Sequence, residues 1–216
     1  MKIVRILSAL ALAILLMAAV GCRSTYYAAY EKFGVYKRDL LKKRVVAARD
    51  EQKEAGEQFQ DALTRLKSMY GFDGGKLEKA YATLQGDYDD CAEKAASVRK
   101  RIKDMESVAG DLFGEWEKEI KEISTPALRD TSRRQLRETR NRYEEMHGAL
   151  KSAEGSMEPV LRQFKDYVLA LKHNLNAAAI ASLKGEATTI QTDISKLIAQ
   201  MNQSIAQADS FIKTLQ

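Results

Sequence analysis

An unbroken apolar repeat between residues 77 and 123 constrains the fold more than any other feature of this sequence. Apolar residues follow one another at alternating spacings of four and three, which is the period of one helix face in a coiled coil. The repeat comprises Leu77, Tyr81, Leu84, Tyr88, Cys91, Ala95, Val98, Ile102, Met105, Ala109, Leu112, Trp116, Ile120 and Ile123. It predicts a long helix with one buried face, to which both Cys91 and Trp116 belong.

The rest of the chain is expected to be helical as well. Only two prolines are present, Pro126 and Pro159, and the strong helix formers Ala, Leu, Glu, Lys, Gln and Arg are abundant. The glycine cluster at 71–75 and the sequence Ser124-Thr125-Pro126 each end one helix and let another begin. We expect helices over about residues 24–70, 76–123, 126–173 and 177–214.

The other three helices carry stripes of the same spacing. Gln52 interrupts the first stripe, and the third is poor near its start, where Ser132, Gln135 and Thr139 stand at core spacing. The apolar members are Leu41, Val45, Ala48, Ala55, Phe59, Ala62, Leu66 and Met69; then Met146, Leu150, Ala153, Met157, Phe164, Leu171 and Leu175; and finally Ile190, Ile194, Leu197, Met201, Ile205, Ala208, Ile212 and Leu215.

Two positions in this scheme have alternatives. Gly155 and Pro159 predict a kink in the third helix, or a break with Ser156 as the cap of a new helix. The last turn is expected at Asn174–Asn176, which gives helices of similar length, and the alternative is a turn at Lys184–Gly185.

Four amphipathic helices with short connections predict an all-α fold, an antiparallel up-down four-helix bundle of coiled-coil type. The alternative is a pair of long hairpins that complete their core only by dimerising. The low charge of residues 174–207 keeps this alternative open, because helix faces with few charges are often interfaces.

The N-terminus reads as a lipoprotein signal peptide over residues 1–21. Lys2 and Arg5 precede an apolar segment that ends in Ala19, Val20 and Gly21, the residues for signal-peptidase recognition, directly before Cys22. An uncleaved transmembrane helix is the alternative, but about 14 to 15 apolar residues fall short of the roughly 20 that span a bilayer. Cleavage by a general signal peptidase is the other alternative.

If Cys22 is lipidated, the mature chain of residues 22–216 is anchored in a membrane through its N-terminal lipid. Arg23, and not Asp, follows the cysteine, so by the sorting rule of enterobacterial lipoproteins nothing retains the protein at the inner membrane. We therefore expect a cell-envelope protein on the periplasmic face of the outer membrane.

The charge, cysteine and histidine content of the chain argues against nucleic-acid binding, an intramolecular disulfide and a metal site. Loss of the leader reduces the net charge of +5 to about +3, and basic and acidic residues alternate, so no nucleic acid is expected as a partner. Cys91 is then the only thiol, which excludes an intramolecular disulfide. His147 and His173 have no partners at ligand spacing, so we expect no metal and no cofactor.

No constellation for catalysis is recognisable. The chain has no phosphate-binding glycine loop, nucleophile elbow or metal motif. The acid pairs Asp89-Asp90 and Glu144-Glu145 are adjacent, so their side chains diverge on a helix. We expect no enzymatic activity.

An arginine cluster at the start of the third helix is a possible interaction surface, formed by Arg129, Arg133, Arg134 and Arg137. Lipid headgroups or an envelope polymer are its candidate partners. The favoured alternative is interhelical ion pairing, because Glu115, Glu117, Glu119 and Glu122 lie on the preceding antiparallel helix.

Three stretches carry a resemblance to a known family: Tyr30–Gly34 continuing into Lys37–Leu40, then Val46–Asp50, and Leu175–Ile180. Together they resemble an uncharacterised family of bacterial envelope proteins, the domain of unknown function DUF2959. The resemblance extends over nearly all of the mature chain. It implies an exported or lipid-anchored helical protein, and brings no activity or catalytic residue.

Two functions remain open. The first is a coiled-coil scaffold or interaction rod in the periplasm that binds a protein partner or self-associates. The second is a helical-bundle binding module or chaperone for a lipid or envelope-protein cargo. Its cavity would be lined by Tyr81, Tyr88, Phe164 and Tyr167, and the favoured alternative is that these residues fill the core.

Overall fold

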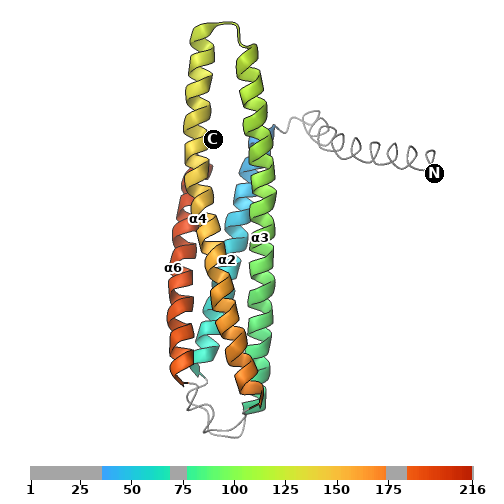
Figure 1. Cartoon of the computed structure of the whole chain (residues 1–216), viewed down its shortest axis with the longest axis vertical. Helices are drawn as coiled ribbons and strands as arrows, with labels where there is room; N and C mark the ends of the chain where they lie inside the picture. Colours follow the sequence, from blue (N-terminus) through green and yellow to red (C-terminus); the bar gives the residue numbers. More distant parts are fainter. Residues whose placement is uncertain (1–35, 69–76, 174–183, 216) are drawn as a thin grey trace, which may run out of the picture. The chain divides into compact units, whose positions relative to one another are not determined.

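The computed structural model describes residues 36–68, 77–173 and 184–215. Four helices follow one another there: α2 (Lys37–Ser68), α3 (Leu77–Glu122), α4 (Pro126–His173) and α6 (Lys184–Thr214) (Figure 1). The helix expected from residue 24, the glycine cluster at 71–75 and the turn expected at Asn174–Asn176 lie outside the described residues.

The chain divides into two compact units, Met1–Leu40 and Leu41–Gln216. In the first unit the structure describes residues 36–40, which contain the beginning of α2. The backbone N–H groups of Asp39 and Leu40 donate to the carbonyl of Tyr36 at 2.9 and 3.1 Å. The second unit, called the bundle below, contains the remainder of α2 and all of α3, α4 and α6.

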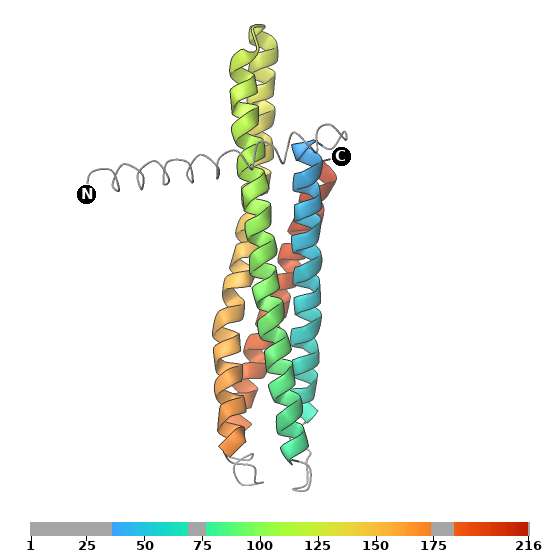
Figure 2. The ribbon, with the colours of Figure 1, turned by 90° about the vertical axis from the view of Figure 1, so that its right-hand side faces the viewer.

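Within the bundle the helices form a ring in the order α2, α3, α4, α6 (Figures 1 and 2). Ion pairs and a ring contact join each neighbouring pair: Glu51 with Lys94, Arg99 with Glu154, Tyr143 with Phe211, and Asp209 with Arg49. Successive helices run antiparallel. The bundle is thus the all-α four-helix arrangement that the apolar stripes predict.

The predicted stripe of α2 lies on the axis of the bundle. Its residues from Leu41 to Leu66, Gln52 included, have no exposed surface. Full burial of a Leu, Phe or Met side chain contributes about 1.5–3 kcal/mol, so these stripes supply the main driving force for helix association. On α3 the stripe from Leu84 to Ala109 is buried too, apart from Tyr88, which is half-buried.

The stripes of α3 and α6 depart from prediction near one end of the bundle. Leu112 and Trp116 are half-buried, whereas Phe113, outside the stripe, is buried. On α6, Ser204 and Phe211 are buried and the predicted Ile205 is only half-buried. A helix in a four-membered ring contacts two neighbours, so residues beside the stripe also reach the core.

The third helix is continuous, and the alternative of a break at Ser156 is wrong. α4 includes Pro159 in its interior, and Ser156 Oγ donates to the carbonyl of Ser152 at 3.0 Å, a bond that a serine inside a helix can make. Proline removes the N–H that would bond the carbonyl of Gly155. Both residues are exposed, so the lost hydrogen bond lies on the solvent side of the helix, where its loss costs least.

The α3–α4 connection follows the predicted chemistry. Residues 123–125 separate the two helices, and Pro126 is the first residue of α4. Proline is favoured there because its fixed φ suits the helix and its missing N–H would have no partner. The N–H of Arg129 donates to the carbonyl of Thr125 at 3.0 Å, which closes the first turn.

Candidate interaction surface

The predicted lipidation residue Cys22 and the recognition residues Ala19, Val20 and Gly21 lie outside the described residues. The other predicted site residues, the four arginines of α4, are described. They belong to the part of the α3–α4 hairpin that extends past the end of α6 (Figures 1 and 2).

Ring contacts establish how far this hairpin extends. Phe211 of α6 lies against Tyr143 of α4 with ring centroids 6.0 Å apart. α6 ends at Thr214, whereas α4 continues back to Pro126. At 1.5 Å per residue, α4 extends about 25 Å beyond Tyr143 and α6 about 5 Å beyond Phe211. We call the resulting projection, residues 113–122 of α3 and 126–139 of α4, the overhang.

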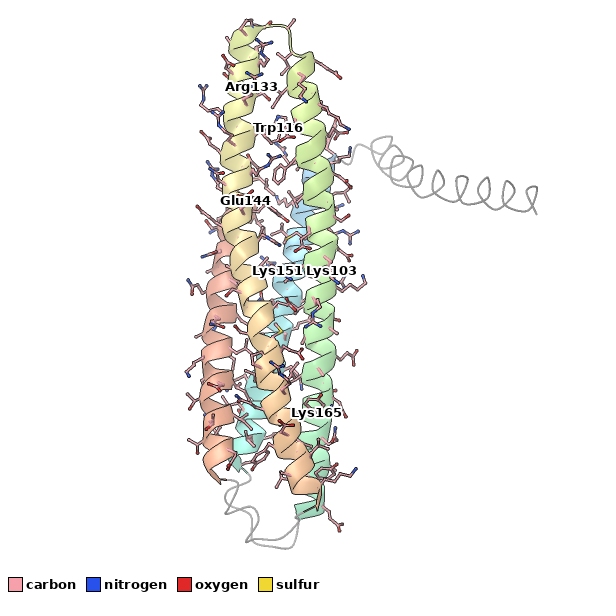
Figure 3. All side chains as sticks on the ribbon, in the orientation of Figure 1. Lys103, Trp116, Arg133, Glu144, Lys151 and Lys165 are labelled. Atoms are coloured by element: carbon pink, nitrogen blue, oxygen red, sulfur yellow. The ribbon has the colours of Figure 1, made fainter. Side chains whose placement is uncertain are left out.

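The overhang has an apolar seam with one helix on each side. Ile120 and Leu136 are buried, Trp116 is half-buried, and its indole Nε1–H donates to Ser132 Oγ at 2.9 Å. Figure 3 shows Trp116 at the side of α3 that faces α4. Leu128, near the connection, is 62% exposed. The polar Ser132 therefore occupies a predicted stripe position because it accepts the tryptophan hydrogen bond.

The two helices of the overhang carry opposite charge. The α3 segment has four glutamates and two lysines, for a net charge of −2. The α4 segment has four arginines against Asp130 and Glu138, for a net charge of +2. The acidic residues of the α3 segment are Glu115, Glu117, Glu119 and Glu122, and the arginines of the α4 segment are Arg129, Arg133, Arg134 and Arg137.

Ion pairing between the two helices, the favoured alternative, occurs at Glu117, and two of the arginines bond within their own helix. Arg133 pairs with Asp130 of its own helix at 3.4 Å, and Arg134 Nη2–H donates to Thr131 Oγ1 at 3.3 Å. One interhelical pair in this region joins Arg140 Nη1 and Glu117 Oε1, which lie 2.7 Å apart. Arg133, Arg134 and Arg137 are exposed, whereas Arg129 is half-buried.

An aromatic cluster closes the bundle at the base of the overhang. The Tyr143 ring packs edge-on against Phe113 of α3 and stacks on His147 of its own helix, with ring centroids 5.5 and 5.6 Å apart. The Arg140 guanidinium lies 5.2 Å from the centre of the Phe113 ring, a cation–π contact. Burial, and to a lesser extent the Glu106 charge, raises the pKa of Tyr143. Its hydroxyl therefore stays neutral at physiological pH.

A buried carboxylate beneath this cluster is held by one cation from α3 and one from its own helix. Glu154 is 6% exposed and accepts from Arg99 Nε–H at 2.7 Å and from Lys151 at 3.2 Å. Burial alone raises the pKa of Glu154, but these two hydrogen bonds and charges outweigh it and lower the pKa. The group is therefore an ionised structural contact between α3 and α4.

At Asp87, burial has a larger effect on the pKa than the neighbouring cation does. Its carboxylate is 4% exposed and lies 2.9 Å from Arg65 Nε on α2. Burial raises the pKa of Asp87, and the arginine charge only partly opposes that effect. Nearby Cys91 is fully buried, and burial, followed by the charges of Asp87 and Asp90, raises its pKa to about 12. A thiol in this environment is a core residue, as the stripe predicted.

The described residues offer no constellation for metal binding. No group of three or more His, Cys, Asp or Glu side chains within them could hold a metal ion. Both members of the pairs Asp89-Asp90 and Glu144-Glu145 are exposed. In the same part of the chain, no helix is long and apolar enough to cross a membrane.

The described residues of the bundle line at least two surface cavities. One, of about 370 Å³, lies between α4 and α6 and is lined by residues including Tyr167, Ala170 and Ile190. The other, of about 210 Å³, lies between α3 and α4 beside Tyr88 and Lys165. Phe164 packs edge-on against Tyr88 at 6.1 Å and is fully buried, so it fills the core and lines neither cavity.

Comparison with known proteins places the described bundle within one family model. The model of a family described as "Protein of unknown function (DUF2959)" matches residues 26–215. A search of curated proteins found no match. The matched region includes all four helices, and its description names no enzymatic activity.

Proposed function

The chain belongs to the DUF2959 family of proteins of unknown function, and we propose that it is a non-enzymatic, lipid-anchored scaffold or interaction rod of the cell envelope. The observation that carries this proposal is a rigid four-helix rod behind a lipoprotein-type N-terminus. α4 alone contains 48 residues, or about 70 Å at 1.5 Å per residue. Such a rod spans a distance and presents long helical faces to a partner.

The anchor is the first component of the proposal. Ala19, Val20, Gly21 and Cys22 follow a basic and then an apolar segment, as lipid transfer and signal-peptide cleavage require. Two or more acyl chains give lasting membrane attachment, whereas one chain gives marginal binding. The residue after the cysteine favours the periplasmic face of the outer membrane.

Intact-protein mass spectrometry tests the anchor. Protein purified from its native membrane is expected to have lost residues 1–21 and to carry acyl chains on Cys22. The variant Cys22→Ala should keep its leader or lose membrane attachment. An unmodified wild-type mass would remove the lipoprotein assignment.

Cross-linking tests the scaffold role. Lys103 of α3 and Lys165 of α4 are exposed (Figure 3), so an amine-reactive reagent applied to intact cells will capture proteins that contact these helices. We expect discrete adducts with wild type that are weaker with Cys22→Ala, which is displaced from the membrane. A rod that yields no adduct in either form would contradict a scaffold.

The binding-module alternative is supported by the cavity between α4 and α6. A volume near 370 Å³ falls within the range of small-molecule sites, about 300–1,000 Å³. An apolar molecule extracted from purified wild type but absent from Ala170→Trp, which fills the cavity, would establish this role. Protein that is free of extractable ligand would exclude it.

A further inference from the structure

The cavity between α3 and α4 is a groove whose floor consists of small side chains. Its lining includes three alanines of α3, Ala92, Ala95 and Ala96. The α3 stripe carries larger residues on either side of Ala95, at Cys91 and Val98, and the alanines leave a hollow of about 210 Å³ between the two helices. Leu161 of α4, which is buried, lines the opposite side. The floor of the groove is therefore apolar.

The rim of this groove is positively charged. It contains three cations, Arg99, Arg162 and Lys165, and one acid, Glu158, for a net charge of +2. Arg99 already pairs with Glu154 at 2.7 Å and with Glu158 at 3.6 Å. Arg162 and Lys165 are exposed and form no ion pair within the described residues, and Figure 3 shows Lys165 on the α3 side of α4. An anion in the groove would relieve the repulsion between these two cations.

Tyr88 adds a hydrogen-bond donor at one end of the groove. Its ring packs edge-on against Phe164, with ring centroids 6.1 Å apart, and its hydroxyl makes no hydrogen bond within the described residues. Arg99 and Glu158 meet at the other end of the groove. Because α3 and α4 run antiparallel, Tyr88 and Lys165 lie at the same end. A phenol hydroxyl and an ammonium group are both donors there.

The charge and the donors of the groove identify a class of ligand. A phosphate monoester carries a charge of about −1.5 to −2 at neutral pH, which matches the net charge of +2 in size and is opposite in sign. The planar guanidinium of Arg162 can bond two phosphate oxygens at once, and Lys165 supplies a point charge. The alanine floor would cover the apolar body of an ester.

We propose that this groove binds an organic phosphate monoester, with its phosphate at Arg162 and Lys165 and its apolar substituent on the alanine floor. Tyr88 donates a further hydrogen bond to the phosphate. A soluble phosphate ester and phosphatidic acid, whose headgroup is a phosphate monoester, both offer this chemistry. The site is separate from the cavity between α4 and α6, and it requires neither the scaffold role nor the lipid anchor.

Calorimetric titration of the full chain, purified in a non-ionic detergent, tests the proposal with two probes. Phenyl phosphate represents the soluble source, and phosphatidic acid dissolved in the same detergent represents the lipid source. Phosphatidylcholine, which has no monoester, is the lipid control and should not bind. We expect saturable binding of a phosphate probe between about 10 µM and 10 mM. Binding of phenyl phosphate supports the site with a soluble ester, and binding of phosphatidic acid alone supports it with a lipid headgroup.

Three variants locate the binding. Arg162→Gln/Lys165→Gln removes the two cations without ion pairs and should weaken binding at least about tenfold. Ala92→Leu keeps every charge but fills the floor, and it should weaken binding at least about fivefold. Arg134→Gln/Arg137→Gln removes two charges elsewhere on α4 and should bind as wild type does. Circular dichroism establishes that each variant is folded.

Absence of saturable binding of both phosphate probes to folded wild type would overturn the proposal. Equal weakening by the two double variants would also overturn it, because the probe would then respond to net charge and not to the groove. So would unchanged binding by folded Ala92→Leu. Acylation of Cys22, cross-linked adducts and an extracted apolar ligand are read separately, so none of these outcomes decides the function proposed above.

Discussion

Ser204 of α6 meets Gln52 of α2 in the centre of an apolar seam, with Ser204 Oγ 3.0 Å from Gln52 Oε1. Both side chains are buried, at 1% and 0% exposed. The Ser204 hydroxyl also lies 2.8 Å from the carbonyl of Met201, and Gln52 Nε2 has no hydrogen-bond partner. A single polar layer of this kind fixes helix register at a cost in stability.

Removing one member of this layer should therefore destabilise the bundle, and removing both should not. Ser204→Ala leaves the Gln52 amide without its contact and is expected to cost about 1–3 kcal/mol. Gln52→Leu/Ser204→Ala replaces the layer with apolar groups and should be neutral or stabilising. Urea unfolding followed by circular dichroism measures both. A double variant less stable than Ser204→Ala would show that the layer is a net stabiliser.

The two buried carboxylates predict opposite effects of neutral isosteres. The pKa of Asp87 is raised above its ordinary value of 3.8, so stability falls as pH rises from that value through the folded-state pKa. Asp87→Asn removes this loss and should stabilise the protein at about pH 7, with the difference vanishing near pH 3. Unfolding at both pH values measures it, and a destabilised variant at neutral pH would mean that the Arg65 pair dominates.

Glu154 is the buried carboxylate for which the neutral substitution should have the opposite effect on stability. Its pKa is lowered below 4.5, so the stability it contributes is present above that value and is lost as pH falls through the folded-state pKa. Glu154→Gln weakens two charge-assisted hydrogen bonds and should cost about 1–3 kcal/mol at neutral pH. The cost should disappear in acid. A pH-independent cost would point to lost packing and not to lost charge.

The sequence predicted the helical stripes well because burial in a four-helix ring imposes its period directly. Every stripe residue of α2 from Leu41 to Leu66 is buried. The sequence could not predict how far one helix is shifted along its neighbour, because many alignments of two apolar stripes bury the same apolar area. The overhang and the aromatic cluster of Phe113, Tyr143 and Phe211 follow from register, and those three residues lie beside the predicted stripes.

The partners of the α4 arginines also could not be predicted from the sequence. The sequence placed Arg133 near the glutamates of α3 but could not choose its partner, since a long side chain reaches either helix. It pairs instead with Asp130, three residues earlier, which is the nearest acid on its own helix. The alternation of charges therefore predicted which helix carries which charge, but not the partner of each arginine.

Trp116 should report local unfolding of the overhang. It is the only tryptophan of the chain and is half-buried between two helices, whereas the bundle below buries its core among four. Segments with fewer buried contacts open at lower free energy. Tryptophan fluorescence should therefore change at a lower urea concentration than the circular dichroism of the helices. Coincident transitions would mean that the overhang unfolds with the bundle.

Core packing near the other end of the bundle can be tested on a single helix. Phe164 is fully buried, whereas Leu169, five residues later on α4, is 43% exposed. Phe164→Ala leaves a cavity against Tyr88 and should cost about 3–5 kcal/mol. Leu169→Ala should stay within about 0.5 kcal/mol of wild type. Equal losses of stability in thermal unfolding would contradict the assigned orientation of α4.

Cys91 should resist thiol chemistry in the folded protein. Its side chain is fully buried, and burial raises its pKa to about 12, so the reactive thiolate is rare and inaccessible. Labelling with a maleimide should be slow in buffer and complete in urea, and non-reducing electrophoresis should show no disulfide-linked dimer. Cys91→Ala serves as the control for labelling elsewhere. Rapid labelling of the native protein would mean that α3 opens locally around Asp87 and Cys91, so that self-association through this thiol would again need to be tested.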